Sequence, residues 1–194
     1  MKIHIEKHNP NWKNDFLALK KKIETALSEF SPVIEHIGST SVPDLSAKPV
    51  IDILVGLQAE SDLDKIVEPM MTAGFVYFKK YEPSWPERRL FVTMKPLTGK
   101  PIPQIFDIGD EYNRGVDYTT SVHIHIIVKG AGDWDRHLAF RDYLTAFPEI
   151  KKEYEVLKLN LSKIEMKSHL EYNAGKNDWI KQKEQEALKW RKNH

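Results

Sequence analysis

The chain has 194 residues, and its 29 Lys or Arg residues nearly balance its 28 Asp or Glu residues, for a formal net charge of +1. With 41% hydrophobic and 29% charged residues, the composition is typical of a folded globular protein and argues against disorder. The absence of cysteine excludes disulfides, thiolate zinc sites and cysteine nucleophiles.

The apolar segments are all shorter than the ~20 residues that a membrane-spanning helix needs. The N-terminus lacks the apolar core of a signal peptide. We therefore expect a cytoplasmic protein that does not contact membranes. Basic residues outnumber acidic ones over 151–194, but the two signs are interspersed, which is typical of a solvated helix surface. Nucleic acid is therefore not an expected partner.

The N-terminal part of the chain predicts a helix followed by two strands that flank a short turn. Asn9-Pro10 is a typical helix start, and apolar residues then recur every three or four positions as far as Phe30. Strands are predicted over 33–37 and 50–55. The second is apolar on both faces except at Asp52, which favours a central strand covered on both sides.

The rest of the chain predicts more strands and then a helical tail. We expect a helix over 61–73 with Gly74 as its C-cap, strands over 75–78, 89–94 and 122–128, a long loop or lid over 96–118, and helices over 133–148, 149–164 and 167–192. Asp133 is a candidate helix cap, and Gly175 is a candidate break in the last helix.

This order predicts an α/β (α+β) fold, a mixed β-sheet with flanking helices. We expect a single domain over 1–194. Its α/β core covers 1–130, and the C-terminal helices of 131–194 pack on that core.

The turn Gly38-Ser39-Thr40-Ser41 is the first candidate site. Glycine lets a ligand approach the backbone closely, and hydroxyls with free N–H groups suit a phosphate. Ordinary helix caps use the same residues, so the turn alone favours neither interpretation. The Gly-Lys-Ser/Thr ending of a Walker A loop is absent.

Asp52 is a carboxylate in an otherwise apolar strand, where a lone charge is costly unless it is paired or binds a metal. We expect a functional carboxylate, and the structural alternative is an ion pair with Lys48 or an arginine. His123 and His125 lie two positions apart on a strand and therefore on one face. Two such imidazoles can bind a metal or polarise a phosphate, or they can be ordinary hydrogen-bonded histidines.

Arg141 shares a predicted helix face with Trp134 and Leu138. An arginine in such a stripe needs a ligand anion or a structural partner, and helix spacing alone slightly favours the structural partner. Tyr172 and Lys176 are four positions apart and form a weaker pair of the same kind.

Six segments together resemble the GrpB family, and the similarity extends from Trp12 to the C-terminal helix. The most specific are IEHIGSTSVP at 34–43 and AKPVIDILV at 47–55, and the others are HIH at 123–125, FRDYL at 140–144, YEVLK at 154–158 and YNAGK at 172–176. The family is grouped with the nucleotidyltransferase fold, and related domains occur fused to dephospho-CoA kinase. The resemblance therefore implies a mixed sheet with helices behind it and a cleft beside the Gly-Ser turn.

In that superfamily the Gly-Ser turn holds a triphosphate, and a pair of carboxylates on the next strand holds two magnesium ions for nucleotidyl transfer. Residues and resemblance together predict phosphate or ligand binding by His36, Gly38, Ser39, Thr40, Ser41, Lys48, Tyr172 and Lys176. They predict catalytic roles for Asp52, His123, His125 and Arg141, with the first three also holding one divalent ion, Mg²⁺, Mn²⁺ or Zn²⁺. Leu54 stands where the second carboxylate is expected, which argues against ordinary two-magnesium transfer.

Two functions therefore remain open, and in both the expected partner is a small phosphate-containing ligand such as a nucleotide. One is an enzyme that transfers or hydrolyses a nucleotidyl or phosphoryl group. The other is a binding or regulatory module for a nucleotide or a coenzyme A precursor, which Leu54 favours. A histidine-triad-like hydrolase lacks its third histidine, replaced by Ile127, and a Ser39-His36-Asp52 triad lacks a nucleophile elbow. The sequence indicates neither the substrate nor the oligomeric state.

Overall fold

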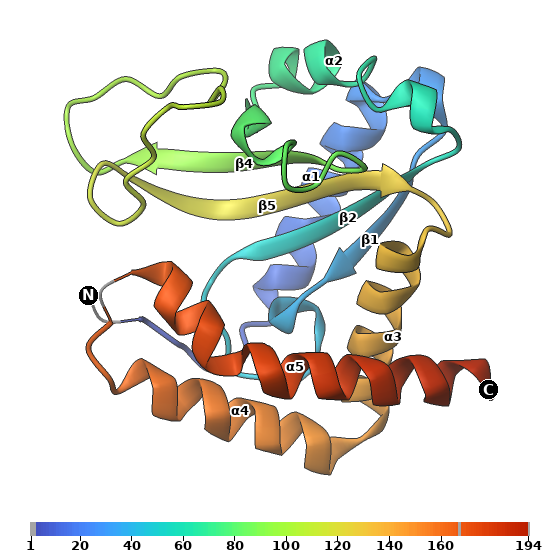
Figure 1. The fold of residues 1–194 in the computed structure, drawn as a ribbon, viewed down its shortest axis with the longest axis vertical. Helices are drawn as coiled ribbons and strands as arrows, with labels where there is room; N and C mark the ends of the chain where they lie inside the picture. Colours follow the sequence, from blue (N-terminus) through green and yellow to red (C-terminus); the bar gives the residue numbers. More distant parts are fainter. Residues whose placement is uncertain (1–2, 167, 194) are drawn as a thin grey trace.

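The computed structural model describes residues 3–166 and 168–193, and a five-stranded sheet lies at its centre (Figure 1). The strands are β1 (Val33–Ile37), β2 (Ile51–Leu57), β3 (Val76–Tyr77), β4 (Arg89–Pro96) and β5 (Tyr118–Val128). Their order in the sheet is β1-β2-β5-β4-β3. The β2–β5 pair is parallel, and the other three pairs are antiparallel. The predicted mixed sheet is confirmed.

Helices cover both faces of this sheet (Figure 1). They are α1 (Asn11–Ala26), α2 (Val67–Thr72), α3 (Gly132–Ala146), α4 (Pro148–Ser162) and α5 (His169–Lys192). The helices α1 and α2 belong to one side, and α3 packs on the opposite side, where α5 lies across it and beside α4. Within the described residues, no helix has both the length and the apolar character needed to cross a membrane.

The central strand β2 serves two hydrophobic cores because successive side chains point to opposite faces. Ile53 is fully buried on the α1 side, in a cluster with Phe16 of α1. Leu54 is fully buried on the other side, in a cluster with Trp134 and Leu138 of α3. The apolar run around Asp52 therefore reflects burial on both faces, as the sequence predicts.

Two helix starts follow local side-chain chemistry. The Asn9 Oδ1 accepts a 3.0 Å hydrogen bond from the Asn11 N–H and so satisfies a free donor at the start of α1, although the N-cap is Pro10 and not the predicted Asn9. Ser168 does the same for α5, where its side chain accepts a hydrogen bond from the Glu171 N–H.

Three local predictions about helices are wrong. The segment predicted as a helix over 61–73 is a 3-10 turn at Glu60–Asp62 followed by the short α2. Pro69 has no N–H for the carbonyl four residues earlier, so a regular helix cannot continue through it from Ser61. Asp133 does not cap α3, whose N-cap is Ala131.

Gly175 does not break the last helix, because α5 is continuous from His169 to Lys192. A Cβ at position 175 would lie 2.7 Å from the Leu161 Cδ2 of α4. The glycine therefore permits the close packing of α4 and α5. The predicted start of this helix, Lys167, lies outside the described residues.

Residues 97–117 form the predicted long connection, here between β4 and β5. Two contacts hold this loop in place. The Tyr118 hydroxyl donates to the Pro101 carbonyl, and Lys100 pairs with Asp117 at 2.7 Å. The loop carries Arg114 into the cleft described next.

Candidate functional site

The Gly38 turn joins β1 to the start of β2 and packs directly on Asp52. Gly38 has φ +71°, and a Cβ there would lie 2.5 Å from the Asp52 Oδ2. Both the backbone conformation and the space therefore require glycine. The Ser41 hydroxyl donates to the Gly38 carbonyl at 2.6 Å and closes the turn. Ser41 thus has a structural partner, whereas Gly38 and Ser39 line the cleft.

Asp52 and His123 lie opposite each other on the parallel strands β2 and β5. The His123 Nδ1 is 3.0 Å from the Asp52 Oδ1, and its Nε2 is 3.1 Å from the Thr120 Oγ1. Burial raises the pKa of Asp52, but the hydrogen bond from His123, with the charge of Lys48, outweighs it and lowers that pKa to about 2. Asp52 is therefore ionised and orients the imidazole, with the Nδ1 proton assigned from this network.

His125 points from the same face of β5 but into different surroundings. Its Nδ1 lies 3.4 Å from the Arg88 Nη1, and its ring stacks on that of His137 at 6.0 Å. Burial, Arg88 and His137 hold the pKa of His125 well below its ordinary value. Among residues 3–166 and 168–193, no group of three His, Asp or Glu side chains is arranged to hold a metal ion. The single-ion site at Asp52, His123 and His125 stays a prediction.

A cavity of about 200 Å³ opens beside Asp52 and Ser39. We call it the basic lobe; its lining comprises Ser39, Thr40, Ala47, Lys48, Val50, Asp52, Arg114, His123, Lys158, Tyr172, Asn173 and Lys176. Lys48, Lys158, Lys176 and Arg114 make no ion pair with a carboxylate within the described part of the chain. Their positive charge is therefore available to a ligand.

Lys158 of α4 is the most buried of these cations, with 2% of its surface exposed. Its Nζ donates to the Ser39 Oγ at 3.0 Å and to the Ser46 carbonyl at 2.5 Å, and it lies 4.6 Å from the centre of the Tyr154 ring. Burial, followed by the charges of Lys176 and Lys48, lowers the pKa of Lys158 to about 7.

Sequence reasoning missed Lys158, although a signal was present. Lys158 lies four positions after Tyr154 and three before Leu161, within the predicted apolar stripe of that helix. A lysine in such a stripe needs a polar partner or a ligand. Arg114 and Asn173 were missed as well, because loop geometry and helix packing bring them to the cleft.

Two further lysines flank the ring of Tyr172. The Nζ of Lys48 lies 4.8 Å from the ring centre, and that of Lys176 lies 4.9 Å from it. Burial, then Lys176 and Arg114, lower the pKa of Lys48 to about 8, and burial lowers that of Lys176. The predicted pair of Tyr172 and Lys176 thus lies in the cleft, together with Lys48.

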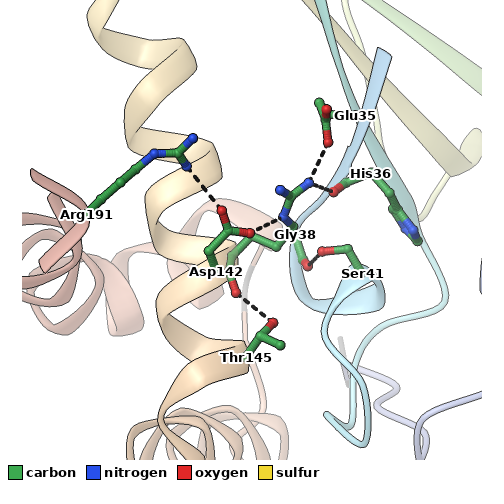
Figure 2. A network of polar contacts seen from close by, with 8 residues as sticks. Glu35, His36, Gly38, Ser41, Asp142, Thr145 and Arg191 are labelled. Atoms are coloured by element: carbon green, nitrogen blue, oxygen red, sulfur yellow. Dashed lines mark hydrogen bonds and ion pairs between the residues drawn. The ribbon is translucent and has the colours of Figure 1, made fainter. Parts of the chain in front are cut away.

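Arg141 makes structural contacts that join α3 to β1, and Figure 2 labels its partners Glu35, His36 and Asp142. Its guanidinium donates to the Glu35 carboxylate at 2.7 Å and to the His36 carbonyl at 3.1 Å, and its Nε donates to Asp142 at 2.7 Å. In the same view, Arg191 of α5 pairs with Asp142 at 3.1 Å. Although Arg141 borders the cleft, these partners fit the structural alternative.

His36 lies outside the cleft, because its strand position faces α1. Its ring stacks on Phe16 at 4.7 Å, and its Nε2 is 3.0 Å from the Thr40 Oγ1, which in turn donates to the Val50 carbonyl. Burial lowers the pKa of His36 to about 4. The neutral imidazole therefore braces the Gly38 turn from behind.

A second cavity, of about 410 Å³, adjoins the first between the sheet, α3 and α5. We call it the apolar lobe; its lining comprises Ile37, Gly38, Ser39, Asp52, His125, His137, Phe140, Arg141, Leu144, Tyr154, Asn173, Lys176, Asn177, Ile180 and Glu184. Ser39, Asp52, Asn173 and Lys176 line both lobes. The two lobes therefore form one cleft.

Comparison with known proteins points to one family. The family model described as GrpB protein matches residues 2–186. The glutamate-rich protein GrpB of Alkalihalophilus pseudofirmus is 34% identical over 157 residues, which cover 80% of this chain and 78% of that protein. The crystal structure of conserved protein GrpB from Enterococcus faecalis matches with a TM-score of 0.77 and 30% identity, covering 96% of this chain and 98% of that chain.

Two other relatives are longer proteins. UPF0157 protein YqkA of Bacillus subtilis is 33% identical over 191 residues, which cover 98% of this chain but 49% of that protein. A protein named dephospho-CoA kinase, from Mycolicibacterium paratuberculosis, is 26% identical over 187 residues, which cover 94% of this chain and 45% of that protein. The chain thus spans about half the length of these two relatives.

Proposed function

This chain belongs to the GrpB family, and we propose that its cleft binds a small phosphate-containing molecule. The observation that carries the proposal is the basic lobe, in which Lys48, Lys158, Lys176 and Arg114 line one cavity together with Ser39. Against these basic groups stand the Asp52 carboxylate of the lining, which is ionised, and Glu155, whose charge acts on Lys158. An unbalanced positive charge in a partly buried cavity attracts anions, and lysine ammonium groups are common phosphate ligands.

The burial of the lysines strengthens this argument. A buried ammonium without a carboxylate partner is costly, as the lowered pKa values of Lys48 and Lys158 indicate. A bound phosphate offsets that cost by supplying the missing negative charge. Ser39 contributes a hydroxyl beside Lys158, at 3.0 Å. We expect this binding to occur in the cytoplasm and to be independent of membranes.

A thermal-shift panel tests the proposal with inorganic pyrophosphate, nucleotides and dephospho-CoA, each with EDTA, Mg²⁺, Mn²⁺ or Zn²⁺. A ligand that binds only the folded state raises the melting temperature. Pyrophosphate should stabilise the protein in EDTA, and Lys176→Met should reduce that effect. The matched control is Lys163→Met, which removes an exposed lysine near the end of α4. No stabilisation by any phosphate compound would refute the proposal.

A second candidate function, nucleotidyl or phosphoryl transfer, is favoured by the contact between Asp52 and His123. An ionised aspartate that orients an imidazole is an arrangement suited to general base catalysis on an acceptor hydroxyl. A two-magnesium site does not fit the residues present, because Leu54 replaces the second carboxylate and is fully buried. We therefore derive no metal-dependent step.

Turnover of a stabilising ligand distinguishes the enzyme from the binding module. If the enzyme hypothesis holds, Asp52→Asn abolishes turnover while binding persists, because the basic lobe remains. If binding occurs with no turnover in the wild-type protein, the chain is a binding or regulatory module. The EDTA and metal arms of the panel test the predicted divalent ion directly.

A further inference from the structure

The apolar lobe has a different chemistry from the basic lobe. Aliphatic and aromatic side chains of Ile37, Phe140, Leu144 and Ile180 line it, together with Tyr154. At about 410 Å³ it is also the larger of the two. A concave apolar surface of this kind favours an apolar group that displaces water from it.

Two charged side chains at the edge of this lobe are already neutralised by the protein. Arg141 pairs with Glu35 at 2.7 Å and donates to Asp142 at the same distance. Glu184 of α5 pairs with Arg136. Neither side chain therefore offers an uncompensated charge to a ligand.

The two histidines of this lobe already contact protein side chains. The His125 Nδ1 lies 3.4 Å from the Arg88 Nη1, and the His137 Nε2 lies 3.2 Å from the Arg136 Nη2. Apart from Asp52 and Lys176, which also line the basic lobe, this lobe thus combines apolar walls with polar groups that the protein already pairs.

We propose that the ligand is amphipathic, with a phosphate-bearing end in the basic lobe and an uncharged, largely apolar group in the apolar lobe. This inference rests on the proposed function. One molecule spans both lobes because Ser39, Asn173 and Lys176 line each of them. The Asp52 carboxylate also lines both lobes and so stands at their junction. It disfavours a second anionic group beyond the first lobe, since like charges repel.

Calorimetric titrations with inorganic phosphate and with 1-naphthyl phosphate, both in EDTA near neutral pH, test this inference. The two probes share the phosphate group and differ in the uncharged ring. Burial of the ring in the apolar lobe should tighten binding by at least about tenfold. Ile180→Trp should abolish that gain because it fills the lobe, while the affinity for inorganic phosphate stays within about a factor of two.

A matched control, Leu170→Trp, places the same side chain on α5 at a position that is 77% exposed and outside the cleft. It should leave the gain intact. If tryptophan at position 180 disturbs the packing of α5, Ile180→Asn serves as the second variant and should reduce the gain. Equal affinity for the two probes would overturn the proposal that the ligand is amphipathic, while the proposal of phosphate binding would still hold. Binding of neither probe would overturn both proposals.

Discussion

Replacing the buried lysine of the basic lobe, Lys158→Met, should stabilise the folded protein and weaken its binding of phosphate. The pKa of Lys158 is lowered from 10.5 to about 7, chiefly by burial. At about 1.4 kcal/mol per tenfold change in proton affinity, keeping this ammonium buried costs about 5 kcal/mol. Methionine also removes two hydrogen bonds, to Ser39 and Ser46, worth about 1 kcal/mol each. The net gain below about pH 7 is therefore about 3 kcal/mol.

The pH dependence of this gain identifies its cause. The folded-state pKa of Lys158 lies below the value for the unfolded chain, so the unfolded state holds the proton more tightly. Wild-type stability therefore rises with pH between about 7 and 10.5 as the penalty is lost. The penalty falls by about 1.4 kcal/mol per pH unit, so the advantage of Lys158→Met should vanish near about pH 9.

Urea unfolding at several pH values, analysed by linear extrapolation, measures this difference. The exposed Lys163 provides the matched control: Lys163→Met should change stability by less than about 0.5 kcal/mol at every pH. A Lys158→Met variant that is less stable than wild type at about pH 6.5 would refute the reasoning, as would a difference that does not vary with pH.

Three further predictions concern the same cleft and its support. The affinity for pyrophosphate should fall as pH rises from about 6 to about 9, because Lys158 and Lys48 lose their protons over that range. Titration calorimetry measures this affinity, and an affinity that rises with pH would contradict the prediction. Gly38→Ala should lower the free energy of unfolding, measured in urea, by at least about 1–3 kcal/mol, because a Cβ at this position meets Asp52 and the backbone has positive φ. Gly99→Ala, with open space around it, should be nearly neutral. Gly175→Ala should cost about 1–3 kcal/mol through its clash with the Leu161 methyl groups, despite the better helix propensity of alanine. A rise in melting temperature would show that the Leu161 side chain moves aside without penalty.

Sequence patterns were most informative where one physical signal decides the outcome. The spacing from Trp12 onward predicts α1, and the placement of His123 and His125 on one face follows from strand geometry alone. The fold class is confirmed for the same reason. The prediction of a helix over 61–73 is wrong because Pro69 interrupts a segment whose apolar pattern is otherwise helical.

The cleft was harder to predict because it depends on contacts between distant segments. Ser39 and Lys158 are 119 positions apart, and only the docking of α4 beside the Gly38 turn brings them together. Arg141 shows the reverse case, since the sequence marks it as needing an anion but cannot indicate that Glu35 supplies it. The direction in which His36 points depends on strand register, which the sequence pattern leaves open.

The four cations of the basic lobe come from two separate parts of the chain. Lys48 and Arg114 belong to the sheet-forming part, whereas Lys158 and Lys176 arrive on the C-terminal helices. Docking of these helices therefore brings like charges together, and Asp52 offsets their repulsion only in part. Under the proposed function, a bound phosphate would act as a counter-ion between the C-terminal helices and the sheet. The ligand would then raise the resistance of these helices to unfolding and to proteolysis, in proportion to its concentration.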